Sequence, residues 1–357
     1  MLRVYAWLAL AFGPRAADTQ DKTLGNTVKD GSMKLLGGLF GSGSAPAKVA
    51  PAAHQHATRP TGSASRTVQV RLSSAQLLIR SGSFPQIQIE GPIELENGPE
   101  GVLVTERFVV PGPPPICRLE VPEGLTIDLH LASGGLTVRN FRGTLLARVQ
   151  NGTVSVEQSE GRFRVVLPTG RVDFERVRGE IDILTSNGSV AARQTQGGLQ
   201  TVSMGGAMEF EDIDGPIVAR TTNGRIQASD LRGSARLSTR TGEVHVSGAC
   251  GPLTVRTQGG DVSLDGSVVA HTTLETHKGS LYLKLGAHTN AHIEARVGQG
   301  MVRAERLTPL PGSSRRTLRT TLGLGQARLR LTSGLGVINV AGPPLQPRPK
   351  RASAASV

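Results

Sequence analysis

Glycine recurs at every ninth position from Gly134 to Gly260, and this spacing constrains the fold more than any other feature of the chain. The second and fourth residues after most of these glycines are apolar, as at Val154 and Val156. Such alternation is typical of a short strand with one buried face. A strand and a glycine turn repeated at a fixed spacing predict an all-β solenoid. The predicted turn glycines are Gly134, Gly143, Gly152, Gly161, Gly170, Gly179, Gly188, Gly197, Gly206, Gly215, Gly224, Gly233, Gly242, Gly251 and Gly260.

Alternate nine-residue units differ, so the full repeat is predicted to hold eighteen residues. One kind of unit carries an apolar residue seven places after its glycine, as at Val177. The other carries a hydroxyl six places after its glycine and often ends in Asn-Gly, as at Asn187-Gly188, a pair that suits the positive φ values of a tight turn. We therefore expect a single-domain β-solenoid, or β-helix, of either handedness, whose coils stack about 4.8 Å apart. The hydroxyl column comprises Thr185, Ser203, Thr221, Thr239 and Thr257.

Composition and strand patterning divide the chain into five segments. We predict a signal-like segment at 1–17, a flexible linker with a weak amphipathic helix at 18–65, strands capping the solenoid at 66–133, solenoid repeats with a C-terminal cap at 134–340, and a basic, Pro-rich disordered tail at 341–357. Whether the first segment is a cleaved signal or an ordinary apolar N-terminus is open. Its apolar run is too short to cross a bilayer, so we expect no transmembrane helix.

The two ends of the array are predicted from departures from the nine-residue spacing. Strand patterns between residues 66 and 133 lack the spacing, and they suit a cap over the first coil. After Gly260 the spacing lengthens to nineteen, at Gly279 and Gly298. We expect Val337–Val340 to close the array at its C-terminal end.

The charge and the cysteine content limit the possible partners. A net charge of +12 and a pI near 10.7 suggest a polyanion as partner. Aromatic residues make up only 3% of the chain, which argues against base stacking and therefore against nucleic acid. Cys117 and Cys250 are too few for a disulfide scaffold, and whether they pair with each other is open.

Sites of chemistry are not apparent in the sequence. A calcium-binding β-roll needs aspartates in its turns, yet Asp261 alone directly follows one of the fifteen glycines. His54 and His56 lie in the predicted linker, and we expect neither a metal nor a cofactor. Turns of about four residues leave no room for the loops that form a catalytic cleft. The acidic group Glu209, Glu211, Asp212 and Asp214 is interpreted as a solvated edge, and the chain is predicted not to be an enzyme.

Residues eighteen apart should lie one above the other. This places Glu175, Arg193 and Glu211 in one column of alternating charge, and pairs Arg162 with Glu180 and Arg164 with Asp182. A further column is an apolar stripe that could dock a partner if it points outward, although we favour a place in the core for it. The stripe consists of Val166, Leu184 and Val202, and it continues as Arg220, Ser238 and Arg256.

Several segments resemble the bacterial putative-adhesin β-strand-repeat family, a domain of unknown function. The segments are Val121-Pro122-Glu123-Gly124, Ser133-Gly134-Gly135, Asn151-Gly152-Thr153-Val154 and Thr185-Ser186-Asn187-Gly188-Ser189-Val190. The resemblance covers roughly residues 66–340. It implies a bacterial, non-catalytic β-solenoid that is often exported or tethered to a membrane.

Three functional hypotheses remain open. We favour a structural or interaction protein in adhesion or envelope organisation, with a protein or polysaccharide surface as its partner and an exported or envelope-associated location. One alternative is a cytoplasmic scaffold that self-associates end to end. The other is a module that binds a polyanion through its basic surface.

Overall fold

The computed structural model describes residues 55–56, 67–83, 86–98, 101–107 and 112–344. All described residues belong to one compact unit, Pro51–Val357. These residues form 23 strands and no helix, so the predicted all-β class is confirmed for them. The described segments contain no helix that is long and apolar enough to cross a membrane. The signal-like segment, most of the linker with His54, and the tail from residue 345 lie outside the described residues.

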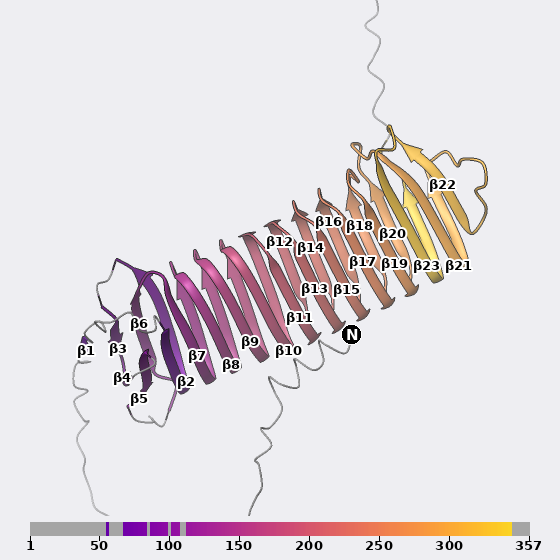
Figure 1. The fold of residues 1–357 in the computed structure, drawn as a ribbon. Coiled ribbons are helices and arrows are strands. Elements are labelled where there is room, and N and C mark those ends of the chain that lie inside the picture. The colour runs from indigo at the N-terminus through magenta and orange to yellow at the C-terminus, as the bar shows by residue number, and fades with distance from the viewer. Residues whose placement is uncertain (1–54, 57–66, 84–85, 99–100, 108–111, 345–357) are drawn as a thin grey trace, which may run out of the picture. The chain divides into compact units, whose positions relative to one another are not determined.

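The strands of the central region pair in parallel at an offset of eighteen residues, which lengthens to nineteen where Leu253 lies beside Thr272 and Val262 beside Leu281, as the glycine spacing predicts. Ile181 lies beside Leu199, Leu199 beside Ile217, and Ile217 beside Ala235. Figure 1 shows these strands side by side. They are β7 (Leu125–Arg139), β8 (Arg142–Glu157), β9 (Glu160–Glu175), β10 (Arg178–Gln196), β11 (Leu199–Gly205), β12 (Met208–Asp214), β13 (Ile217–Asn223), β14 (Ile226–Leu231), β15 (Ala235–Thr241), β16 (Val244–Ala249), β17 (Leu253–Gly259), β18 (Val262–Gly266), β19 (Thr272–Lys278) and β20 (Leu281–Leu285).

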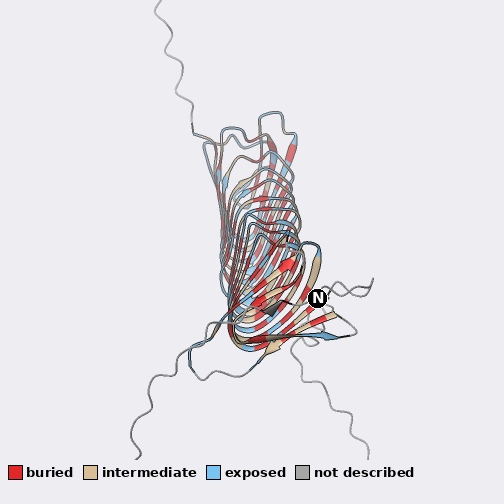
Figure 2. Ribbon diagram, turned by 90° about the vertical axis from the view of Figure 1, so that its left-hand side faces the viewer, coloured by how far each residue is buried: buried red, intermediate tan, exposed pale blue. Residues whose placement is uncertain are grey.

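Each repeat contributes one segment to each of two ladders of strands. Ladder A contains β11, β13, β15, β17 and β19, and ladder B contains β12, β14, β16, β18 and β20. The long strands β8, β9 and β10 supply their first halves to ladder A and their second halves to ladder B. Along both ladders buried residues alternate with more exposed ones (Figure 2), and the buried side chains of both form one hydrophobic cluster.

The core of the central region consists of between one and five buried apolar side chains from each strand, with the larger numbers in the long strands β7 to β10. Phe141, Phe163 and Phe174 lie together in it, with ring centroids 6.3 Å apart for the first pair and 6.0 Å apart for the second. Both pairs meet edge to face, the geometry that aromatic quadrupoles favour. The predicted apolar position seven places after alternate glycines is buried as well, at Val177, Ile213 and Leu231.

Glycine is required where one repeat stacks on the next. A Cβ atom on Gly152 would overlap the carbonyl oxygen of Gly134, and one on Gly170 would overlap that of Gly152. The φ angles of these glycines lie between +127° and +143°, a region that residues with a side chain rarely adopt. The same column continues through Gly188, Gly206, Gly224, Gly242, Gly260, Gly279, Gly336 and Gly300. Gly298, which the spacing places in this series, stacks on Gly334 instead.

The predicted tight turn at Asn-Gly is wrong, because the strand runs through the pair: at Asn151-Gly152 the glycine has a φ of +143°, yet β8 continues to Glu157. At Asn187-Gly188 neither residue has a positive φ in the left-handed region, and β10 continues through the pair without a break. The reason is that the chain crosses to the other ladder and does not turn back to pair with itself. The left-handed residue of each repeat lies instead at the opposite corner, in the series Asn140, Gln158, Arg176, Gln194, Asp212, Asp230 and Gly248.

Of the N-terminal strands, which the sequence predicts to form a cap, the first belongs to the stack. β2 pairs with β7 along almost its whole length, from Thr67 beside Thr126 to Arg80 beside Arg139. The chain then leaves the stack and covers β2 with β5 and β6, on which β4 and β3 lie antiparallel. β1, within the predicted linker, pairs with β3. The bounds are β1 (Gln55–His56), β2 (Thr67–Gly82), β3 (Gln88–Glu90), β4 (Ile93–Gly98), β5 (Gly101–Glu106) and β6 (Ile116–Pro122).

The C-terminal end is closed by a different segment from the one predicted. β23 (Ala327–Ala341), which contains Val337–Val340, stacks directly on β19 and β20. β21 (Ala291–Glu305) lies outside β23, and β22 (Thr317–Leu322) pairs antiparallel with β21. The last described strand therefore lies one position inside the end of the stack, between β21 on one side and β19 and β20 on the other.

Candidate functional site

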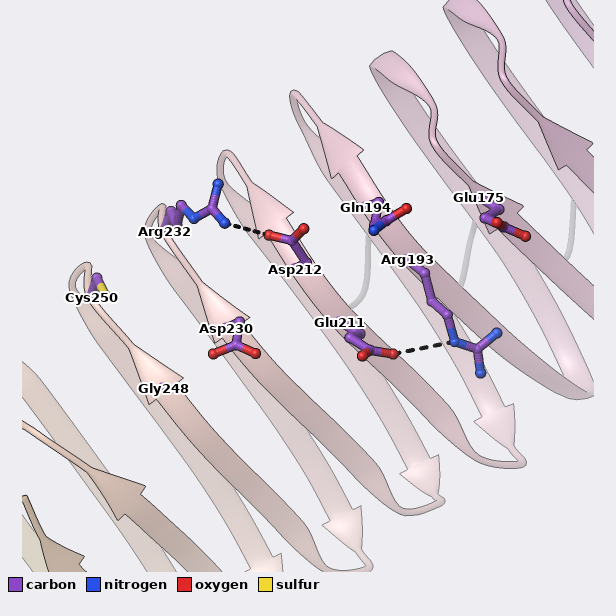
Figure 3. Close-up of a pocket in the computed structure, with 9 residues that line it drawn as sticks. All are labelled: Glu175, Arg193, Gln194, Glu211, Asp212, Asp230, Arg232, Gly248 and Cys250. Carbon is purple, nitrogen blue, oxygen red and sulfur yellow. Dashed lines mark hydrogen bonds and ion pairs between the residues drawn. The ribbon is translucent and has the colours of Figure 1, made fainter.

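The acidic group predicted as a solvated edge lies beside a shallow groove on the left-handed corners of successive repeats (Figure 3). The groove has a volume of about 610 Å³, and Glu211, Asp212, Asp230 and Cys250 are among its lining residues. Arg193 forms ion pairs with Glu209 and Glu211, at 3.2 and 3.4 Å. Arg232 pairs with Asp212 at 2.7 Å. Three of the four predicted carboxylates are thus neutralised by arginine on an exposed surface.

A second groove lies at the same corner of earlier repeats and has a volume of about 590 Å³. Arg142 and Glu160 line it, and they form an ion pair at 3.9 Å. Both grooves are spaces between charged side chains that stack from one repeat to the next. The residues that line the two grooves include Cys250, Ser81 and Ser159 but no histidine. Neither groove therefore places a hydroxyl or thiol nucleophile beside a histidine base.

The charged columns predicted from the 18-residue repeat are largely present. Arg162 pairs with Glu180 at 2.9 Å, and Arg164 pairs with Asp182 at 3.5 Å. Burial raises the pKa of Asp182, and the charge of Arg164 works against that rise. Glu175 differs from the prediction, because its ion pair is with the adjacent Arg176 at 3.1 Å. Exposed pairs of this kind help to fix the register and add little stability.

The hydroxyl column lies inside the stack. Thr185, Ser203, Thr221, Thr239 and Thr257 are all at least 93% buried. Thr239 donates a hydrogen bond to the carbonyl oxygen of Gly224, at 3.5 Å. Solvent does not reach this column, so it lines the corner next to the glycine column and offers no binding array.

The apolar stripe Val166, Leu184 and Val202 lies on the outer side of ladder A, half-exposed. The preference for a core position is wrong, because the strand alternation continues to the end of each segment and buries the neighbours Val165 and Leu167. Further apolar residues lie beside the stripe on the same face. They are Leu146, Pro168, Met204 and Val218.

Four arginines lie next to this stripe on ladder A. The column predicted from the sequence contains only two of them, Arg220 and Arg256. Arg220 on β13 and Arg256 on β17 flank Ser238 of β15 in register. Arg236 and Arg240 lie two residues before and two residues after Ser238 on the same strand, hence on the same face. We call these four residues the arginine cluster. The 18-residue repeat could have revealed the arginine cluster. Arg236 and Arg240 each lie two residues away from the position that stacks on Arg220 and Arg256, on either side of it.

Metal-binding groups are not apparent in the part of the chain that the structure describes. Across residues 67–83, 86–98, 101–107 and 112–344, no three His, Cys, Asp or Glu side chains lie close enough together to hold a metal ion. The side chain of His56 is not among those described. The histidines His130 and His245 contact Arg148 and Ser263, respectively.

The two cysteines are free and differ in exposure, which leads to a testable difference in reactivity. Cys117 is 1% exposed, and burial together with the charge of Glu106 raises its pKa to about 11. Because the thiolate is the reactive form, we expect native protein at neutral pH to be alkylated by iodoacetamide at the exposed Cys250 and not at Cys117. Peptide mass spectrometry checks this result, with labelling of both cysteines in denaturant as the control. Labelling of Cys117 in native protein would contradict it.

Comparison with known proteins gives weak matches only. No family model and no curated protein matches the chain. A putative cell adhesion protein from Clostridium sporogenes ATCC 15579 is 9% identical, with 82% of this chain and 99% of that chain covered and a TM-score of 0.20. A putative adhesin from Bacteroides fragilis NCTC 9343 is 10% identical, with 81% and 96% covered and a TM-score of 0.23. At such TM-scores the likeness carries no conclusion about this chain.

Proposed function

We propose that this chain is a β-solenoid that acts as a non-catalytic interaction protein, adhesin-like or associated with the cell envelope. The observation that carries the proposal is the continuous parallel register from β7 to β20, with an offset of eighteen residues that lengthens to nineteen in the last step, onto β19 and β20. Stacked parallel strands with short corners form a stiff body with long, flat outer faces, and such faces suit recognition of an extended partner. The corner grooves, lined by paired charges, do not suit catalysis.

End-to-end self-association is a less favoured function. At the C-terminal end β22 lies antiparallel on β21, and the segment after β21 contacts both strands: the Leu310 amide donates to the carbonyl oxygen of Arg319, and the Val302 amide to that of Arg315. At the N-terminal end the antiparallel strands β3 and β4 occupy the corresponding places. Strand edges covered in this way are protected against pairing with a second chain.

The location is tested by protease treatment of intact cells that produce the tagged protein, together with cell fractionation. We expect digestion of the solenoid in whole cells, because an adhesive surface must be accessible from outside. A tagged cytoplasmic protein serves as the control for cell integrity. Complete protection, with recovery in the soluble cytoplasmic fraction, would contradict the adhesin-like role and leave the scaffold hypothesis.

The non-catalytic character is tested by incubating purified protein with a panel of polysaccharides. We expect no new reducing ends and no fall in viscosity over a day, since the described surface has no acid–base pair in a cleft. A glycosidase of the same concentration shows that the assay can detect turnover. Depolymerisation of any polysaccharide by this protein would overturn the proposal.

A further inference from the structure

We infer that the arginine cluster on ladder A is a binding site for an acidic polysaccharide with closely spaced carboxylate or sulfate groups. The inference rests on the proposed function as a non-catalytic platform and names the class of its partner. It goes further by assigning binding to one patch, which the overall basic charge of the chain does not do.

The register fixes the arrangement of the cluster. Arg220 and Arg256 lie one strand on either side of Ser238, at about 4.8 Å from it, the ordinary spacing between strands. Arg236 and Arg240 lie along β15 in both directions from Ser238, at about 7 Å, the distance between alternate residues of a strand. Four long cationic side chains therefore surround one small hydroxyl residue on a flat surface.

Three of the four arginines in the cluster lack an acidic partner among the described residues. The other outward residues of β13, β15 and β17 at these positions are Val218, Thr222, Thr254 and Gln258, and none is acidic. Arg256 pairs with Glu275 at 2.9 Å, whereas Arg220, Arg236 and Arg240 form no ion pair with a described residue. Earlier in the same ladder Arg162 and Arg164 each face a carboxylate one repeat away. Like charges on neighbouring strands are unfavourable, so a bound anion would relieve their repulsion.

The surroundings favour a polysaccharide over a nucleic acid. The hydroxyl groups of Thr222, Ser238 and Thr254 and the amide of Gln258 can exchange hydrogen bonds with sugar hydroxyls. Val202 and Met204 on the neighbouring strand β11 provide apolar surface for the CH faces of sugar rings. Proteins that bind single-stranded nucleic acids commonly stack the bases on aromatic side chains. The exposed aromatic side chain among the described residues, Tyr282, is on β20 of ladder B, away from this cluster.

The experiment compares two triple variants with the same change in net charge. Arg220→Gln, Arg236→Gln and Arg240→Gln remove most of the cluster. Arg303→Gln, Arg315→Gln and Arg316→Gln remove three exposed arginines from the C-terminal end of the stack and serve as the matched control. Binding to heparin and to polygalacturonate is measured by titration at several salt concentrations, with oligo(dT) and neutral dextran as further probes. The two glycans distinguish sulfate from carboxylate as the recognised group.

We expect the cluster variant to bind the preferred glycan about tenfold more weakly, with a flatter dependence on salt because fewer counterions are released. The control variant should change the dissociation constant less than twofold. Equal losses in both variants would assign binding to diffuse charge and overturn the inference. So would tighter binding of oligo(dT) than of both glycans, or no glycan binding by the unaltered protein.

A second variant keeps the inference testable if the triple variant folds poorly. Ser238→Asp places a carboxylate among the four guanidinium groups and supplies an internal anion. We expect it to raise the thermal midpoint and to weaken glycan binding at least as much as the triple variant. A lowered midpoint with unchanged binding would contradict the inference. If the protein neither binds nor cleaves the glycans, this inference fails and the proposed non-catalytic function stands. If the protein depolymerises a glycan, the proposed non-catalytic function itself fails.

Discussion

Replacing Gly197 with alanine is expected to lower the free energy of unfolding by about 3 kcal/mol or more, because strain and steric overlap add. Gly197 has a φ of +118°, and a Cβ atom there would overlap the carbonyl oxygen of Gly179, one repeat away. The overlap is with backbone, so it can be relieved only by moving two stacked repeats apart. The hydrogen bond from the Gly197 amide to the Asp214 carbonyl oxygen, at 2.8 Å, would be disturbed on the other side.

The next residue in the chain provides the control. Gly198 has no positive φ in the left-handed region, and a Cβ atom there would enter open space. Gly198→Ala should therefore change the free energy of unfolding by no more than about 1 kcal/mol, with stabilisation as the expected sign because alanine restricts the unfolded chain. Urea denaturation followed by circular dichroism measures both variants, and hydrogen exchange at the Gly197 amide locates the damage. Equal effects of the two substitutions would show that the close approach of Gly197 to Gly179 is not required for stacking.

Replacing Phe163 with alanine is expected to cost about 3–5 kcal/mol of folding free energy, the range for large-to-small changes at buried aromatic sites. Phe163 is fully buried and meets both Phe141 and Phe174 edge to face. The three rings come from different positions of the repeat: Phe163 is on the ladder A half of β9, Phe174 on its ladder B half, and Phe141 at the corner before β8. The cavity would therefore loosen both ladders at one level of the stack.

Leu324→Ala is the matched control for this substitution, since Leu324 is 85% exposed. Its effect should lie within about 0.5 kcal/mol, as for most surface changes. Thermal denaturation shows which of the two variants has the lower midpoint, and we expect it to be Phe163→Ala. Digestion at low protease concentration should then cut the Phe163→Ala protein first near residues 140–175. A loss of less than about 1 kcal/mol for Phe163→Ala would mean that the aromatic contacts do not hold the ladders together.

The repeat length was the part of the fold that could be predicted best. Glycine is visible in a sequence because no other residue tolerates the close approach of Gly152 to Gly134, and its spacing gives the parallel register directly. The left-handed corner was not predictable in this way. Residues as different as Asn140, Arg176 and Asp230 occupy it, because the strain is modest and many side chains tolerate it at a surface corner.

The order of the strands at the C-terminal end could not be predicted for a topological reason. β23 carries the same alternation as any other segment, so its sequence does not tell whether it lies at the end of the stack or one position inside it.

The sequence predicted which surface residues stack on one another, but it predicted less well whether a given column faces the core or the solvent. Val166 follows Gly161 by five places. Because the residues two, four and six places after this glycine face the core, Val166 faces outward. The arginine cluster depends on neighbours across three strands and becomes visible only when the register is applied to the whole sequence.

The offset of eighteen residues shared by the strands from β7 to β18 has a consequence for how such a chain can change in length. Deleting residues 188–205 would join positions that already occupy equivalent places in adjacent repeats, so the flanking strands could stack on each other without a change of register. Deleting nine residues would instead bring a segment of ladder A onto ladder B and put a buried hydroxyl position where the left-handed corner must be. In this part of the stack, length is therefore gained or lost in whole repeats if both ladders are to keep their register. Each repeat gained or lost would shift the two ends by about one strand spacing while keeping every remaining surface column intact.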